Sequence, residues 1–257
     1  MHHKQQGQAT VYVLVGIVLL VVVILVSLLR GQFSLPFLSR EPLPDALVAL
    51  THHIEDCIKS VGEEPLDTIG SQGGYLKLSE DTFASYNGSS ISFLCYNRAD
   101  DLRCYNRMLT LREMEGTLSY AINEQLSRCF SFSKFKRGVD LQVGRTNVAT
   151  VINPDTVIVT LHMPIVLRRG DTTVQQDSFS HVFSLPLGRL YTASQIIVDG
   201  ESEFGEFDYI SYILDTQGTV FIDQEKPYPH VLYTLRTDSS PYLFRFMIQG
   251  ERGLLAR

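Results

Sequence analysis

Residues 147–168, NVATVINPDTVIVTLHMPIVLR, alternate apolar and polar side chains with a period of two. Successive side chains of a β-strand point to opposite faces, so this period indicates strands with one buried and one solvated face. Similar runs occupy residues 139–143, 172–176 and 180–185, and the triplets Asn-Pro-Asp at 153–155 and Arg-Gly-Asp at 169–171 are typical of turns. Strands joined by such short turns predict an antiparallel sheet.

Outside this region the apolar residues follow helical spacing. Residues 45–61 place one apolar face on a helix, and Thr110-Leu-Arg-Glu113 is a capping box that predicts a second helix ending near Cys129. Shorter helices are expected at 190–198 and 207–214, with further strands at 75–78, 91–96, 219–223, 231–236 and 242–248. The predicted class is therefore α+β, with helices packed on one face of an antiparallel sheet.

The segment from Val11 to Leu29, VYVLVGIVLLVVVILVSLL, carries no charged residue. As a helix it would be about 28 Å long, close to the ~30 Å hydrocarbon core of a bilayer. We predict a transmembrane helix over residues 11–30 that contacts the bilayer through 11–29, after a short segment at 1–10. A Pro-containing linker at 31–44 then leads to an α+β domain at 45–257. A buried soluble helix and a cleaved signal peptide are the alternatives, and a cleavage site of small residues is not evident after Leu29.

The charge distribution argues against nucleic acid as a partner. Of the 22 lysines and arginines only Lys4 and Arg30 lie in the first thirty residues, and all 28 acidic residues follow them. The remainder of the chain is therefore net acidic. Binding to phosphate backbones needs a basic stripe that this sequence does not show.

Four cysteines, Cys57, Cys95, Cys104 and Cys129, follow the apolar segment, and none forms a CxxC pair. Three pairings are open. Cys57 and Cys129 both lie on apolar helix faces near C-terminal ends, whereas Cys95 and Cys104 flank a short polar loop, so we favour Cys57–Cys129 and Cys95–Cys104. Disulfides persist in oxidising compartments, which would place the N-terminus in the cytoplasm and the domain outside. Four reduced cysteines are the alternative.

Other polar groups give weaker signals. The helical cluster at 52–57, HHIEDC, offers potential metal ligands without the H-E-x-x-H spacing, and the acidic stretch 199–208 departs from calcium-loop spacing. Asn87-Gly-Ser89 is a possible glycosylation sequon. We assign no catalytic, cofactor-binding or metal-ligating residue, and no cofactor is expected.

Several sequence features together resemble a known group. These are Lys4-x-x-Gly7-Gln8-x-Thr10 before the apolar segment, the Cys57 helix, Gln72-Gly-Gly-Tyr75, and the segments 163–168 and 185–191. This combination is similar to single-pass membrane-anchored proteins of small-genomed archaea, a group with no established activity. The N-terminus also resembles an archaeal type IV pilin-like (class III) signal, which implies processing between Gly7 and Gln8. Tyr12 replaces the glutamate that such signals carry at mature position five.

These features predict a membrane-anchored, extracytoplasmic interaction or structural protein of the cell envelope, without catalysis and with a protein partner at the envelope. One alternative is a filament subunit of the pilin type. The other is an envelope ligand-binding or enzymatic domain whose site is assembled from residues distant in sequence.

Overall fold

The computed structural model describes residues 15–25, 43–97, 104–136 and 138–250. The chain divides into two compact units, Met1–Pro42 and Leu43–Arg257. In the first unit residues 15–25 are helical. The ends of the predicted transmembrane helix, the segment 1–10 and nearly all of the predicted linker lie outside the described residues. Within the described ranges, no helix is both long enough and apolar enough to cross a membrane.

The second unit begins with the long helix α2 (Leu43–Ser71), which lies along the helix α3 (Leu111–Cys129). The predicted 45–61 helix is thus confirmed but extends ten residues further, through Pro65. α3 begins at the predicted capping box, where the Thr110 hydroxyl accepts from the Glu113 amide and the Glu113 carboxylate accepts from the Thr110 amide. This reciprocal pairing satisfies two amides at the helix start.

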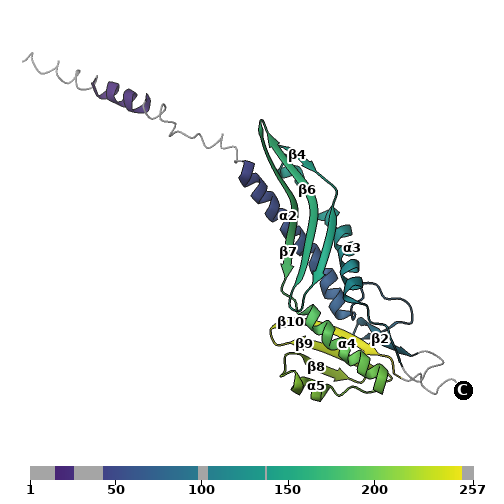
Figure 1. Cartoon of the computed structure of the whole chain (residues 1–257). Helices are drawn as coiled ribbons and strands as arrows, with labels where there is room; N and C mark the ends of the chain where they lie inside the picture. Colours follow the sequence, from purple (N-terminus) through teal and green to yellow (C-terminus); the bar gives the residue numbers. More distant parts are fainter. Residues whose placement is uncertain (1–14, 26–42, 98–103, 137, 251–257) are drawn as a thin grey trace, which may run out of the picture. The chain divides into compact units, whose positions relative to one another are not determined.

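The first sheet contains β4 (Asp140–Val143), β5 (Asn147–Ile152), β6 (Val157–Arg169) and β7 (Thr172–Phe183), all antiparallel. β6 is central: β4 and β5 follow one another along one of its edges and β7 pairs with the other. The odd-numbered residues of β6 from 157 to 167 are all buried. On this sheet α2 packs against β6 and β7, and α3 packs against β5 (Figure 1). The sheet predicted from the alternating residues is confirmed, with one face buried and the other largely exposed.

The second sheet combines strands from both ends of the unit, in the order β1-β2-β10-β9-β8, with β3 also paired to β2. Their bounds are β1 Phe83–Tyr86, β2 Ser89–Asn97, β3 Cys104–Asn106, β8 Phe221–Glu225, β9 Val231–Thr237 and β10 Ser240–Ile248. The pairing of β2 with β10 is parallel, and the other pairings of this sheet are antiparallel. The helix α4 (Leu187–Phe204) lies against β2, β3, β9 and β10, and the short helix α5 (Tyr209–Asp215) follows it (Figure 1).

The predicted α+β class is therefore correct. The predicted arrangement, with helices on one face of a single antiparallel sheet, is wrong. Two sheets form, one of them mixed, because β2 and β10 join across about 150 residues of sequence. A strand predicted at 75–78 is also absent, since residues 72–80 are turns and irregular backbone. Most buried side chains of the two sheets and of α2, α3 and α4 form one hydrophobic core. A smaller, separate cluster in the second sheet consists of Ile91, Phe93, Leu232 and Met247.

Candidate functional site

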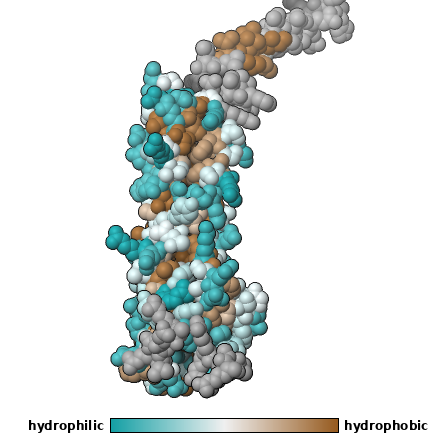
Figure 2. Space-filling model, turned by 90° about the vertical axis from the view of Figure 1, so that its right-hand side faces the viewer, coloured by the Kyte–Doolittle hydropathy of each residue, from teal (hydrophilic) through white to brown (hydrophobic). Residues whose placement is uncertain are grey.

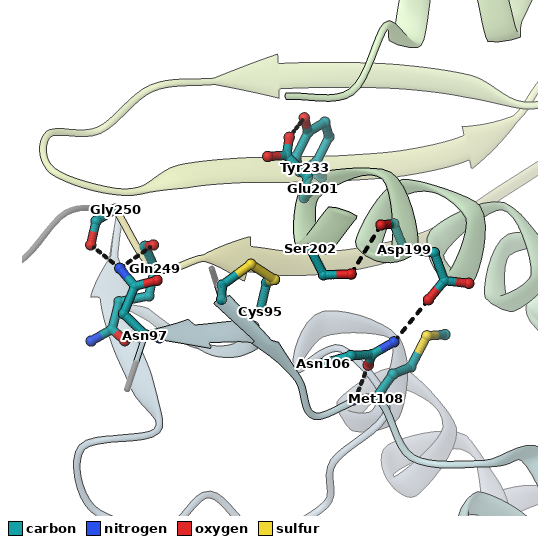
Figure 3. The surroundings of a disulfide bond; sticks show 11 residues. Cys95, Asn97, Asn106, Met108, Asp199, Glu201, Ser202, Tyr233, Gln249 and Gly250 are labelled. Carbon is teal, nitrogen blue, oxygen red and sulfur yellow. Dashed lines mark hydrogen bonds between the residues drawn. A yellow bond between two sulfur atoms is a disulfide. The ribbon is translucent and has the colours of Figure 1, made fainter. Parts of the chain in front are cut away.

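Both expected disulfides are present in the structure. Cys57 of α2 is bonded to Cys129 of α3, with a Cα–Cα distance of 5.8 Å, and Cys95 of β2 is bonded to Cys104 of β3, with a Cα–Cα distance of 5.2 Å. No cysteine remains free, because these four are all that the chain contains. The first bond holds the two long helices together, and the second joins neighbouring strands beneath α4 (Figure 3).

A groove with a volume of about 630 Å³ lies between α2, α3 and the segment that follows α2. Its charged lining residues are two acidic ones, Glu64 and Glu124, and two basic ones, Lys77 and Arg128. Tyr120 is 65% exposed, while Pro65 is buried. The remaining lining residues are Thr68, Tyr75, Leu76, Leu109, Thr117, Ala121 and Gln125.

This groove has the chemistry of a binding surface. The four charges balance formally, so the lining favours neither a strongly anionic nor a strongly cationic ligand. Its hydroxyl, amide and carboxylate groups offer hydrogen bonds around apolar side chains, an arrangement that ligand sites commonly show. The Cys57–Cys129 bond lies between the two helices that form the walls, and fixed walls reduce the entropic cost of binding.

A buried polar cluster lies elsewhere, between α4 and the second sheet. Glu201 is 8% exposed and accepts a hydrogen bond from the hydroxyl of Tyr233, which is fully buried (Figure 3). The Gln224 side chain in turn donates to the Tyr233 hydroxyl over 2.7 Å. Burial raises the pKa of Glu201 above its ordinary value, and the hydrogen bond from Tyr233 opposes that rise. Because each of these three side chains has a hydrogen-bond partner within the cluster, we interpret the cluster as part of the packing of α4.

The sequence did not reveal Glu201 as a buried residue. It lies in the acidic stretch 199–208, whose composition predicts a solvent-exposed segment. The helix predicted from the sequence also ended before it, at Val198. The available signal was spacing, since Glu201 follows Ile197 and Val198 by four and three residues on the buried face of α4.

The potential metal ligands of α2 do not come together. His52 and Glu55 lie 3.8 Å apart at the surface, whereas His53 contacts the ring of Phe135. Cys57 is in a disulfide. Across the residues that the structure describes, no group of three or more histidine, cysteine, aspartate or glutamate side chains is placed to hold a metal ion.

Asn87 lies in the turn between β1 and β2 and is exposed. Asn87 and Gly88 both have positive φ angles, 49° and 78°, as the two central residues of a tight hairpin turn require. The side chain is therefore accessible, and its glycosylation stays a prediction. The predicted processing site at Gly7 and Gln8 lies outside the described residues.

Comparisons of the chain with protein-family models, with curated proteins and with solved structures find no match in any of the three.

Proposed function

We propose that this chain is a single-pass, membrane-anchored protein whose α+β unit lies outside the cytoplasm and acts in the cell envelope by binding, without catalysis. The observation that carries the proposal is the pair of disulfides, because such bonds persist in oxidising compartments and are rare in the cytosol. Each bond connects a different pair of elements, so both contribute to the fold.

The apolar helix supports the membrane anchor. Its ten large side chains between Val15 and Leu25 are each 49–62% exposed, and the helix is hydrophobic throughout (Figure 2). Hydrophilic residues are interspersed with hydrophobic ones on the face of the second unit drawn there. Moving one such side chain from water to an apolar environment gains roughly 1.5–3 kcal/mol, so ten of them favour a lipid environment strongly.

Topology can be tested with intact cells. After mild reduction, a membrane-impermeant maleimide should label the cysteines of the full chain to the same extent as a permeant one. A variant with alanine at all four cysteine positions is the control for background. Labelling that requires permeabilised cells would overturn the extracytoplasmic placement.

We propose the groove between α2 and α3 as the surface that binds the protein partner. Both walls are helical and are joined by a disulfide, and Tyr120 offers an exposed aromatic ring of the kind enriched at interfaces. A photo-crosslinking amino acid in place of Tyr120 should give one discrete adduct in cells. The same group at Tyr228, which is 86% exposed and outside the groove, is the matched control and should give none. Equal adducts at both positions would contradict the assignment.

A filament subunit of the pilin type is the second candidate. The observation that favours it is the order of elements: an apolar N-terminal helix, then the 29-residue helix α2 packed on an antiparallel sheet. This candidate predicts a mature N-terminus at Gln8 and polymer in material sheared from cells. Mass spectrometry of the N-terminal peptide decides the point, since a retained Met1 would contradict processing.

A further inference from the structure

Within the described residues, no strand pairs with the outer edge of β7, and α2 packs against this strand. β7 pairs with β6 on one side and is the last strand of the first sheet on the other (Figure 1). Along its second half Ser178 and Ser180 are exposed and Val182 is 51% exposed. A strand edge of this kind presents unpaired backbone groups to its surroundings.

The hydrogen bonds of β5, at the opposite edge of the sheet, show in which direction the backbone groups of β7 point. The amides of Thr150 and Ile152 in β5 donate to side chains of α3, so they point away from β6. Backbone groups alternate in direction along an antiparallel strand, and directly opposed residues point either both toward or both away from each other. Val159 and Val157, which oppose these two residues, therefore direct their backbone groups toward β7.

The same alternation continues into β7. His181 and Phe183 oppose Val159 and Val157 and bond toward β6. Ser178, Ser180 and Val182 consequently direct their amides and carbonyls outward. Within the described residues, one hydrogen bond reaches the outward backbone groups of these three residues. The Gln176 side chain donates to the Ser178 carbonyl over 3.2 Å.

The other long edge is covered. In β5 the Glu115 carboxylate and the Ser119 hydroxyl of α3 accept the outward amides. The edge strand β8 has only five residues and carries Asp223 and Glu225, and short, charged edges resist pairing. β7 is twelve residues long and contains neither lysine nor proline, and its one acidic residue, Asp177, lies just before the segment 178–182.

We propose that β7 pairs with β7 of a second copy of this chain, antiparallel and around a two-fold axis at Ser180. In this register Ser180 opposes Ser180 of the second copy, and Ser178 opposes Val182. The choice follows from symmetry, because the three outward-directed residues are centred on Ser180 and this register uses all of them. An isologous two-fold contact is also the commonest arrangement of homodimers.

The contact is small, so we expect a reversible dimer. Five strand residues a side, 178–182, bury less than the roughly 1,000 Å² that a stable interface needs. Anchoring of both copies in one membrane would raise their effective concentration, but the pairing itself does not depend on the anchor. The dimer can therefore fail without affecting the proposed function, and the reverse also holds.

Cysteine crosslinking of the full chain in detergent micelles tests the register. Opposed residues of a bonded antiparallel pair have Cα atoms ~5.5 Å apart, within the range of a disulfide. With Ser180→Cys, copper-catalysed oxidation by oxygen should give a covalent dimer on a non-reducing gel. Ser178→Cys is the matched control: it is equally exposed, but its two copies would be about 13 Å apart, beyond disulfide reach.

We expect at least ten-fold faster crosslinking of Ser180→Cys than of Ser178→Cys, with both native disulfides intact by mass spectrometry. Adding Val182→Pro to Ser180→Cys should abolish the dimer while preserving the fold, because proline removes an outward amide that β6 does not use. Equal crosslinking of the two single variants, or no dimer at any concentration, would overturn the proposal. Unfolding caused by Val182→Pro would overturn it as well, since the amide would then be bonded inward.

Discussion

At the residue scale, Glu201 shows how one buried acid couples the fold to pH. Burial raises the pKa of its carboxyl above the ordinary value of 4.5, so the folded protein keeps a proton that the unfolded chain has already lost. Stability therefore falls as the pH rises from 4.5 through the raised pKa.

His230 acts in the opposite sense: burial lowers its pKa below 6.5, and its Nδ1 accepts the Gly250 amide over 3.3 Å. Protonation of His230 would break that bond, so its contribution to stability is lost as the pH falls.

The substitution Glu201→Gln should remove the part of this pH dependence that belongs to Glu201. The slope of the free energy of unfolding against pH should change by up to about 1.4 kcal/mol per pH unit above pH 4.5. Urea unfolding across a pH series measures it. His230 is present in both proteins, so its opposite slope cancels in the difference. Parallel curves for the two proteins would show that Glu201 titrates normally.

Glu115 provides a second test at this scale, because its Oε1 accepts the Ile152 amide of β5 over 2.8 Å. Glu115→Ala leaves that amide without its partner at a residue that is 7% exposed, which should lower the free energy of unfolding by about 1–3 kcal/mol. Glu124→Ala, at an exposed position of the same helix, should stay within about 0.5 kcal/mol of the parent. Equal effects of the two substitutions in urea titrations would refute the role of Glu115 in covering the edge.

At the element scale, local patterns in the sequence predicted the elements well. The faces of α2 and α3 and the capping box at Thr110 follow from residues three and four apart, and the alternation along β6 follows from residues two apart. Such patterns report which side of an element is buried. They say little about which element covers it, and the division into two sheets was therefore missed.

Pro164 lies inside β6, and the strand continues through it. The register of β6 with β7 shifts between His162 and Ile165, and the Pro164 carbonyl accepts the amide of Gly144, which lies between β4 and β5. Proline is tolerated in a strand at such an irregularity because no ladder bond to its nitrogen is needed.

The two disulfides should contribute unequally to stability. In the chain-entropy model the stabilisation grows with the logarithm of the closed loop, and the bonds span 72 and 9 residues. Cys57→Ala with Cys129→Ala should therefore lower the free energy of unfolding by about 2 kcal/mol more than Cys95→Ala with Cys104→Ala. Denaturant titration of both double variants under oxidising conditions checks the difference, and the reverse order would contradict it.

At the scale of the whole molecule, an apolar N-terminal helix precedes an α+β unit that two disulfides hold together. The sequence predicted both pairings, because Cys57 and Cys129 fall on apolar helix faces and Cys95 and Cys104 flank one short loop. The groove between α2 and α3 could not be predicted in this way, since its lining comes from segments about fifty residues apart whose polar side chains carry no shared pattern.

The redox state of the four cysteines in living cells tests the central claim most directly. Cells are quenched with acid and alkylated before lysis, and the chain is then digested without reduction and analysed by mass spectrometry. We expect one crosslinked peptide pair containing Cys57 and Cys129, another containing Cys95 and Cys104, and no alkylated cysteine. Recovery of all four residues as alkylated thiols would contradict a unit that resides in an oxidising compartment.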